Sequence, residues 1–423
     1  MKKLLLTALV ASTVVFTSCF KDDDTPIIIE ETTIIQNPGG GSGDECPVIA
    51  VTGEIADGTV WTNDNIYQLN QKVVVPAGAT LTINPGTIIK GSSGTGSLAS
   101  ALIIARGATI NANGTANEPI IFTSSADNIT CGETAGTNLD ENDRGLWGGL
   151  IVLGNAPCSF SGDIPEAQIE GIPADDTFGL YGGTVADDSS GSLRYISIRH
   201  GGALIGEGNE INGLTLGGVG SGTVIDNIEV VGNVDDGVEF FGGTCNASNL
   251  LVWAQGDDAL DIDQAYAGTI DNAVVVLGDI SDHAFEIDGP EGTANGAFTL
   301  RNVTIVGNNV TSNGEYADYR SNAQGLTENV YAYGFPAGKD VELDNDGVAT
   351  NYNNGDLTFG PWEIVLPTGV TNVTDIFVNN AETVTVSGFG STATAVTEGS
   401  QTVGANTSNL SWTYSNVAGG LGF

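Results

Sequence analysis

The chain contains one pattern three times, as VDDGVEFF (234–241), GDDALDID (256–263) and SDHAFEID (281–288). In each copy an acidic turn precedes a short stretch that alternates apolar and other residues. Val238, Leu260 and Phe285 occupy the same place in the three copies, 22 and then 25 residues apart. A sequence that repeats at this spacing is typical of a solenoid, in which each repeat forms one coil and stacks on the coil before it.

The residues between these copies predict strands rather than helices. NLLVWAQG (249–256) and NAVVVLGD (272–279) each supply a second strand to a coil, and an earlier pair of repeats lies at 73–89 and 102–121. The chain has 60 Gly and 13 Pro, and no long apolar pattern of helical period follows the N-terminus. The leucine and asparagine consensus of leucine-rich repeats is missing, and a β-sandwich does not repeat its sequence in this way. We therefore expect an all-β chain that forms a single parallel β-helix.

Five further stretches carry a resemblance to a known family: ATLTINPGT (79–87), GLWGGLIVLGNAP (145–157), RYISIRHGG (194–202), NGLTLGGVG (212–220) and DDGVEFFGG (235–243). Together they resemble a family of bacterial, Bacteroidetes-type surface lipoproteins with a β-helix. The repeat pattern also resembles the right-handed parallel β-helix of the pectate-lyase-like superfamily. The resemblance implies a right-handed solenoid displayed on a cell surface.

The N-terminus predicts export. Residues 1–18 combine two lysines with an apolar run too short to span a membrane, which is typical of a cleaved signal peptide. Phe16-Thr17-Ser18-Cys19 resembles a lipobox, which implies that Cys19 is lipidated, and the acidic run after Lys21 resembles an outer-membrane export signal. Residues 19–47 are expected to form a flexible, lipid-anchored tether. The β-helix should then occupy 48–423, with 362–423 as its terminal coils and cap.

The net charge limits the classes of partner that the chain can bind, and the cysteine content limits its disulfide pairings. A formal charge of −40 excludes nucleic acid as a partner and favours divalent cations, which prefer carboxylate oxygens. The membrane is contacted only through the lipid anchor. Export permits disulfides, and the four cysteines after Cys19 allow three full pairings. Cys131 and Cys158 are about one coil apart, so this pair is favoured.

Strand alternation predicts where the acids point. If Leu260 and Ile262 fill the solenoid, Asp261 and Asp263 face outward toward solvent, above and below related acids on neighbouring coils. Two interpretations of this stacking are open. The acids form either a solvated face with no ion, or a site for Ca²⁺ between coils made by Glu239, Asp261, Asp263, Glu286 and Asp288.

A catalytic interpretation stays open beside these two. The motifs of polygalacturonases, which are inverting hydrolases of this fold, resemble Asn233-Val234-Asp235, Asp257-Asp258 and His283. The resemblance implies that Asp258 is the acid and that Asp235 and Asp257 activate water. His283 lacks flanking glycines, and no lysine follows Arg320 at the expected place, which argues against a uronate substrate.

The remaining candidates are ligand-binding side chains. Tyr316 and Tyr319 could stack on sugar rings beside Arg320, and Arg199 is a second cationic candidate, also for a lyase. The sequence thus predicts a non-enzymatic surface lipoprotein that binds glycan or extracellular matrix, with Ca²⁺ as the only candidate cofactor. A polysaccharide hydrolase, or a lyase, is the alternative.

Overall fold

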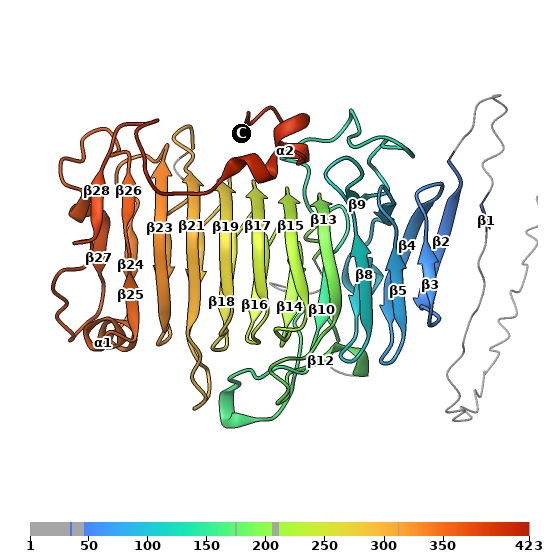
Figure 1. The fold of residues 1–423 in the computed structure, drawn as a ribbon, viewed down its shortest axis with the longest axis horizontal. Helices are drawn as coiled ribbons and strands as arrows, with labels where there is room; N and C mark the ends of the chain where they lie inside the picture. Colours follow the sequence, from blue (N-terminus) through green and yellow to red (C-terminus); the bar gives the residue numbers. More distant parts are fainter. Residues whose placement is uncertain (1–33, 36–45, 174–175, 205–210, 312, 423) are drawn as a thin grey trace, which may run out of the picture. The chain divides into compact units, whose positions relative to one another are not determined.

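The computed structural model describes residues 34–35, 46–173, 176–204, 211–311 and 313–422, and these residues form a right-handed parallel β-helix (Figure 1). Within them, 26 strands join in one sheet, and every pairing in that sheet is parallel except that of β1 (Ile34–Ile35) with β2. The predicted signal peptide, Cys19 and most of the tether lie outside the described residues. No helix in the described ranges is long and apolar enough to cross a membrane.

Each coil contributes to three columns of stacked strands. Column 1 contains short strands: β7 (Ala101–Ile104), β10 (Leu150–Leu153), β14 (Leu214–Gly217), β16 (Val238–Phe241), β18 (Leu260–Asp263), β20 (Phe285–Ile287), β22 (Ala317–Tyr319), β24 (Val341–Leu343) and β27 (Phe377–Asn379). The register places Val238 beside Leu260 and Leu260 beside Phe285, as the repeat predicts.

Columns 2 and 3 share long, bent strands: β13 (Gly191–Arg199), β15 (Val224–Val231), β17 (Asn246–Trp253), β19 (Thr269–Val276), β21 (Phe298–Val306) and β23 (Gly325–Tyr333). The bend lies at a stacked row of asparagines with left-handed backbone: Asn227, Asn249, Asn272, Asn302 and Asn329, with φ of 56–68°. Asn tolerates this conformation better than most residues. Their side chains also join coils, since the Asn272 amide donates to Asn249 Oδ1 at 2.7 Å.

Shorter strands build the first and last coils. The first coils contain β2 (Val48–Glu54), β3 (Thr59–Trp61), β4 (Ile66–Val75), β5 (Thr80–Ile83), β6 (Ile88–Gly91), β8 (Thr109–Asn113) and β9 (Ile120–Ser124). The last contain β25 (Leu357–Phe359), β26 (Trp362–Ile364) and β28 (Ala393–Ala395). Thr80 pairs with Thr109, so the two Gly-Ala-Thr triplets stack as their spacing predicts.

Two segments lie outside the regular coils and cover strand faces. An insertion after β10 carries the small antiparallel pair β11 (Ala167–Gln168) and β12 (Leu180–Tyr181) and packs on the outer face of column 1. The C-terminal segment, red in Figure 1, runs back from β28 across the long strands to α2 (Tyr414–Val417). Residues 362–395 therefore continue the coils, whereas the rest of the predicted cap covers a side of the solenoid.

The helices are few and short. α1 (Asp346–Asn354) follows β24, and its first amides donate to the side chain of Asn345. Five short 3₁₀ helices lie in connections of the described chain: η1 (Gly96–Leu98), η2 (Ser161–Asp163), η3 (Thr177–Gly179), η4 (Val373–Ile376) and η5 (Thr407–Leu410). α1 closes on Gly355, whose positive φ of 82° ends the helix and turns the chain into β25.

The disulfide prediction is wrong. Cys131 pairs with Cys46, whose Cα lies 5.7 Å away, while Cys158 and Cys245 are free thiols. Cys131 lies in the loop after β9 and packs with Cys46 against column 3, whereas Cys158 begins the insertion after β10 in column 1. A spacing of one coil does not bring two cysteines together when they leave the solenoid from different columns.

Candidate functional site

The outward face of column 1 carries a continuous row of acids, which we call the acidic ladder. Its rungs pair in register from β16 to β24 and are Glu239, Asp261, Glu286, Asp318 and Glu342. The first three rungs confirm the predicted column. The other two continue it over two more coils, so the ladder is longer than predicted.

The ladder faces outward, but much of it is not in solvent. Leu260 and Ile262 fill the interior as predicted, yet Asp261 between them is only 8% exposed and Glu239 only 4%. Asn212 donates to Glu239 and also to Glu170 of the insertion, so this end of the ladder is covered. The expectation of a fully solvated acidic face is therefore wrong for these rungs.

Burial among like charges raises the pKa of the covered acids. Asp236, at the turn before β16, lies with Glu239 and Asp261 in a group whose ligand oxygens are all within 4.8 Å of one another. Desolvation raises the pKa of each of the three well above its ordinary value, and the negative charge of neighbouring acids raises it further. At the end of β18, burial raises the pKa of Asp263 to about 7.

Arg320 pairs with acids in the later rungs of the ladder, on β20 and β22. The Arg320 guanidinium, directly after β22, pairs with Glu286 and with Asp288, where its Nε lies 3.0 Å from Oδ2. Its Nη1 is 4.0 Å from Asp318 Oδ2. Burial and the charge of Glu342 nevertheless raise the pKa of Asp318 to about 7. Arg320 thus offsets part of the charge on β20 and β22 and lies one coil or more from the buried triad.

The acidic turns before the strands form a second row of contacts between coils. The Asp258 amide donates to Asp236 Oδ1 at 2.9 Å, and the His283 amide donates to Asp258 Oδ1 at 2.7 Å. The His283 ring Nδ1 is also 2.9 Å from the same oxygen. Burial alone would lower the pKa of His283, but Asp258 and other carboxylates outweigh it and raise the pKa to about 9. The ring is therefore an imidazolium held against Asp258.

The predicted catalytic residues fall into two groups rather than one. Asp235 and Asp257 lie together with Asp236, while Asp258 lies with His283 and Glu286. Asp257 is exposed to solvent on one side, but the protein around its carboxyl group partly desolvates it. This partial desolvation, together with the charge of Asp258, raises the pKa of Asp257 to about 6. The side chain of Asp258 is only 5% exposed, and one of its oxygens already accepts from His283. An acid in that position does not reach a sugar bound on the surface.

The predicted ligand-binding side chains are mostly inside the protein. Tyr316 and Tyr319 belong to the interior core and are fully buried, so neither ring offers a face to a sugar. Arg199 is buried beneath the C-terminal segment, where its guanidinium lies 4.4 Å from the centre of the Tyr414 ring. These three predictions are corrected. Alternation along β22 places Tyr319 inward, Tyr316 lies in the turn before β22 and stacks on Phe335 in the core, and the C-terminal segment covers Arg199. Arg320 alone is accessible, and it is paired with acids.

The donor set of the ladder suits a hard divalent cation. Ca²⁺ takes six to eight oxygens at roughly 2.3–2.6 Å, so two oxygens that share one ion lie up to about 5 Å apart. The triad of Asp236, Glu239 and Asp261 meets that limit, and so does a second group made by Asp318, Glu342 and Asp344. One oxygen of Asp261 and one of Asp318 are buried and have no hydrogen-bond partner among the described residues. Such oxygens are costly to bury unless they bind something.

The five residues predicted as metal ligands therefore do not form one site. Glu239 and Asp261 belong to the buried triad, Asp263 borders it, and Glu286 and Asp288 are paired with Arg320. Asp318, Glu342 and Asp344 were not predicted as ligands. Their signal is present in EYADYR (315–320) and VELD (341–344), which repeat the order of apolar residue, acid and apolar residue.

Comparison with known proteins places the chain in a family. No curated protein matches the sequence. Two crystal structures of the pectin methylesterase from Aspergillus niger, in its deglycosylated and penultimately deglycosylated forms, are similar at 11% and 12% identity with TM-scores of 0.29 and 0.31. Each alignment covers 90% of this chain and 97% of the other. The family model described as a pectate-lyase like beta helix domain matches residues 53–416, and the chain therefore belongs to the pectate-lyase-like β-helix family.

Proposed function

We propose that this chain is a surface-displayed lipoprotein that binds a glycan or a matrix component without cleaving it, and that Ca²⁺ in the acidic ladder stabilises the binding face. The observation that carries the proposal is the buried triad of Asp236, Glu239 and Asp261, in which a carboxylate oxygen lies inside the protein with no partner among the described residues. A chain that buries three acids together gains stability from any cation that binds them.

The absence of cleavage is supported by the state of Asp258. Its carboxylate is buried and holds the imidazolium of His283, so it serves as a link between coils. The net charge of −40 also repels polyuronates, the acidic polysaccharides on which polygalacturonases and pectate lyases act. The glycan that fits this surface is therefore neutral.

Surface display is supported by the sequence of residues 1–24 alone. The short apolar segment, the lipobox-like Phe16-Thr17-Ser18-Cys19 and the acidic run after Lys21 together predict an exported chain that is lipidated at Cys19. Metabolic labelling with a radioactive fatty acid tests this part. The label should enter the wild-type protein and be lost in Cys19→Ala.

Affinity electrophoresis through gels that contain neutral or acidic polysaccharides tests the binding function. We expect at least one neutral polysaccharide to retard the protein in Ca²⁺, with weaker retardation in EDTA, and no release of reducing ends or unsaturated products. Asp258→Asn should leave the digestion assays unchanged, since there is no cleavage to lose. If no polysaccharide retards the protein, the glycan-binding proposal fails.

A hydrolase is the second candidate, because Asp257 is exposed and has a pKa raised to about 6 beside Asp235. An exposed carboxyl group that titrates near neutral pH can act as a general acid or base. This candidate expects reducing ends to accumulate from some polysaccharide and to disappear in Asp257→Asn. Release of reducing ends that survives this substitution would exclude Asp257 from the reaction.

A further inference from the structure

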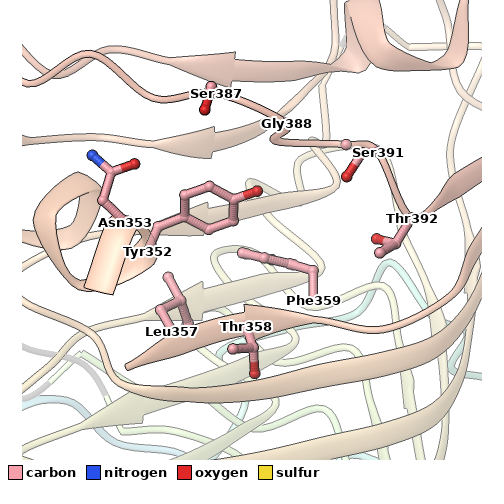
Figure 2. Close-up of a pocket in the computed structure, with 10 residues that line it drawn as sticks. Tyr352, Asn353, Leu357, Thr358, Phe359, Ser387, Gly388, Ser391 and Thr392 are labelled. Carbon is pink, nitrogen blue, oxygen red and sulfur yellow. The ribbon is translucent and has the colours of Figure 1, made fainter. Parts of the chain in front are cut away.

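A hollow of about 370 Å³ lies at the last coils of the solenoid, and no residue of the acidic ladder lines it. Figure 2 shows it between α1 and β25 on one side and the loop 387–392 on the other. Its volume falls within the range of small-molecule sites, roughly 300–1,000 Å³. None of the residues predicted as ligands from the sequence lines it.

Two aromatic rings form the apolar part of the hollow. Tyr352 extends from α1 toward the loop 387–392, and Phe359 lies beneath it on β25 (Figure 2). Their centroids are 6.0 Å apart at 49°, and both rings pack against Phe389 at 5.2–5.3 Å. Contacts with Phe389 thus help to hold both rings in place. Both rings are only partly buried, so each leaves part of its surface open.

Hydroxyl groups form the polar part. Ser387, Ser391 and Thr392 line the hollow from the loop and are exposed. Within the described ranges, their hydroxyls and the Tyr352 phenol make no hydrogen bond to another residue, so all four can donate to or accept from a ligand. The Asn353 amide nitrogen donates to Thr385 O at 3.0 Å, which leaves its carbonyl oxygen as a further acceptor.

The ten residues that line the hollow include no charged side chain. A phosphate or carboxylate ligand would find no cation there, and the chain's negative charge opposes it. A pyranose unit has an apolar face that suits an aromatic ring and hydroxyl groups that suit the surrounding side chains. We propose that this hollow binds one neutral hexopyranose unit of a glycan, with its apolar face on Tyr352 and its hydroxyls bonded to Ser387, Ser391 and Thr392.

The inference rests on the proposed glycan-binding function and assigns it a place that the acidic ladder does not share. The test is a titration of the purified protein with neutral oligosaccharides built from glucose, galactose or mannose, followed by saturation-transfer NMR and calorimetry. We expect at least one of them to bind. Tyr352→Ala should lower its affinity at least tenfold, and Tyr352→Phe, which keeps the ring, should lower it only a few-fold.

Two further variants separate binding from folding. Ser391→Trp fills the hollow from an exposed position and should abolish binding without unfolding the protein. Tyr333→Ala removes a partly exposed ring that stacks on Tyr331 in β23, and it should leave the affinity within about twofold of wild type.

The outcomes distinguish the two claims. If an oligosaccharide binds the wild type and both Tyr352→Ala and Ser391→Trp bind it equally well, the hollow is not the site, while the glycan-binding function stands. If no oligosaccharide binds the wild type, both claims fail. Preferential binding of an oligouronate would overturn the assignment of a neutral sugar.

Discussion

Two faces of the same solenoid bury carboxylates in opposite ways. On column 3, Glu229 of β15 is fully buried and accepts hydrogen bonds from the Ser197 and Ser415 hydroxyls and from the amides of Tyr414 and Ser415. On column 1, Asp261 of β18 is nearly as buried, but its neighbours include Asp236, Asp258 and Glu239. One acid is surrounded by donors and the other by acids.

The difference comes from the segment that covers each face. The C-terminal segment crosses column 3 and presents backbone amides at α2, so the covered carboxylate is fully hydrogen-bonded. The insertion after β10 covers column 1 and brings Glu170, a further acid. The Glu229 carboxylate thus finds its hydrogen-bond donors within the protein, whereas no cation among the described residues is paired with Asp236, Glu239 or Asp261. The comparison therefore separates a structural acid from acids that are suited to a ligand.

The largest expected effect is the loss of Glu229. Glu229→Ala would leave two amides and two hydroxyls without their acceptor and would remove a negative charge that stabilises the charged form of the buried Arg199. We expect the free energy of unfolding to fall by about 3–5 kcal/mol, as when a buried charge loses its partner. Urea denaturation measures this effect. The exposed Glu382→Ala is the control and should change it by less than about 0.5 kcal/mol. A loss below about 1 kcal/mol would show that the donors around Glu229 stabilise little.

The second largest expected effect is a gain in stability on replacing Asp261, and it depends on whether Ca²⁺ is present. Two carboxylates on adjacent coils, about 4.8 Å apart, repel by roughly 3.5 kcal/mol at an effective dielectric near 20. In EDTA, Asp261→Asn should therefore raise the free energy of unfolding by on the order of 2 kcal/mol. In Ca²⁺ the gain should disappear, because the variant loses a ligand.

Asp226→Asn provides the matched control for Asp261. Asp226 of β15 is paired with Arg194 at 3.1 Å and accepts from Ser248 and Asn249. Its replacement should lower stability slightly, with or without Ca²⁺. If Asp261→Asn destabilises the protein in EDTA as well, the ladder acids do not repel one another and the ion has no reason to bind.

The smallest expected effect is a dependence of the free energy of unfolding on pH in EDTA. The pKa of Asp263 and of Asp318 is raised to about 7, so these groups hold protons in the folded state that the unfolded state has already released. Stability should then fall as pH rises toward and through 7. His283 changes stability in the same direction, because its pKa is raised from 6.5 to about 9. Its charged form stabilises the fold fully below about pH 6.5, and this stabilisation is lost as the pH rises through 9.

We expect a loss on the order of 1 kcal/mol between about pH 6 and pH 8, after allowance for solvent screening of the partly exposed groups. Thermal denaturation in EDTA across this range measures it. Saturating Ca²⁺ should flatten the dependence, because the ion binds the ionised carboxylates. A stability that rises with pH in EDTA would contradict the raised pKa values.

The register of the ladder is predictable from the sequence because it depends on local rules. Side chains alternate along a strand, and a repeated pattern must stack on itself if each coil is to bury its apolar residues. These two rules are sufficient to place Glu239, Asp261 and Glu286 in one column. The same rules apply to Asp318 and Glu342, but the later repeats have Gly314 and Gly338 where the stronger copies have the first aspartate of the turn.

What the sequence by itself determined is the coil: strand alternation, turn positions and the stacking of like acids. What only the tertiary structure decided is what covers each coil. The insertion that covers the Glu239 end of the ladder, the C-terminal segment that surrounds Glu229 and the pairing of Cys46 with Cys131 all join residues that are far apart in the chain. Such contacts follow no repeat, because each forms once, between segments whose directions depend on where they leave the solenoid. The hollow at Tyr352 has the same origin, since its two sides meet only after the last coils have stacked.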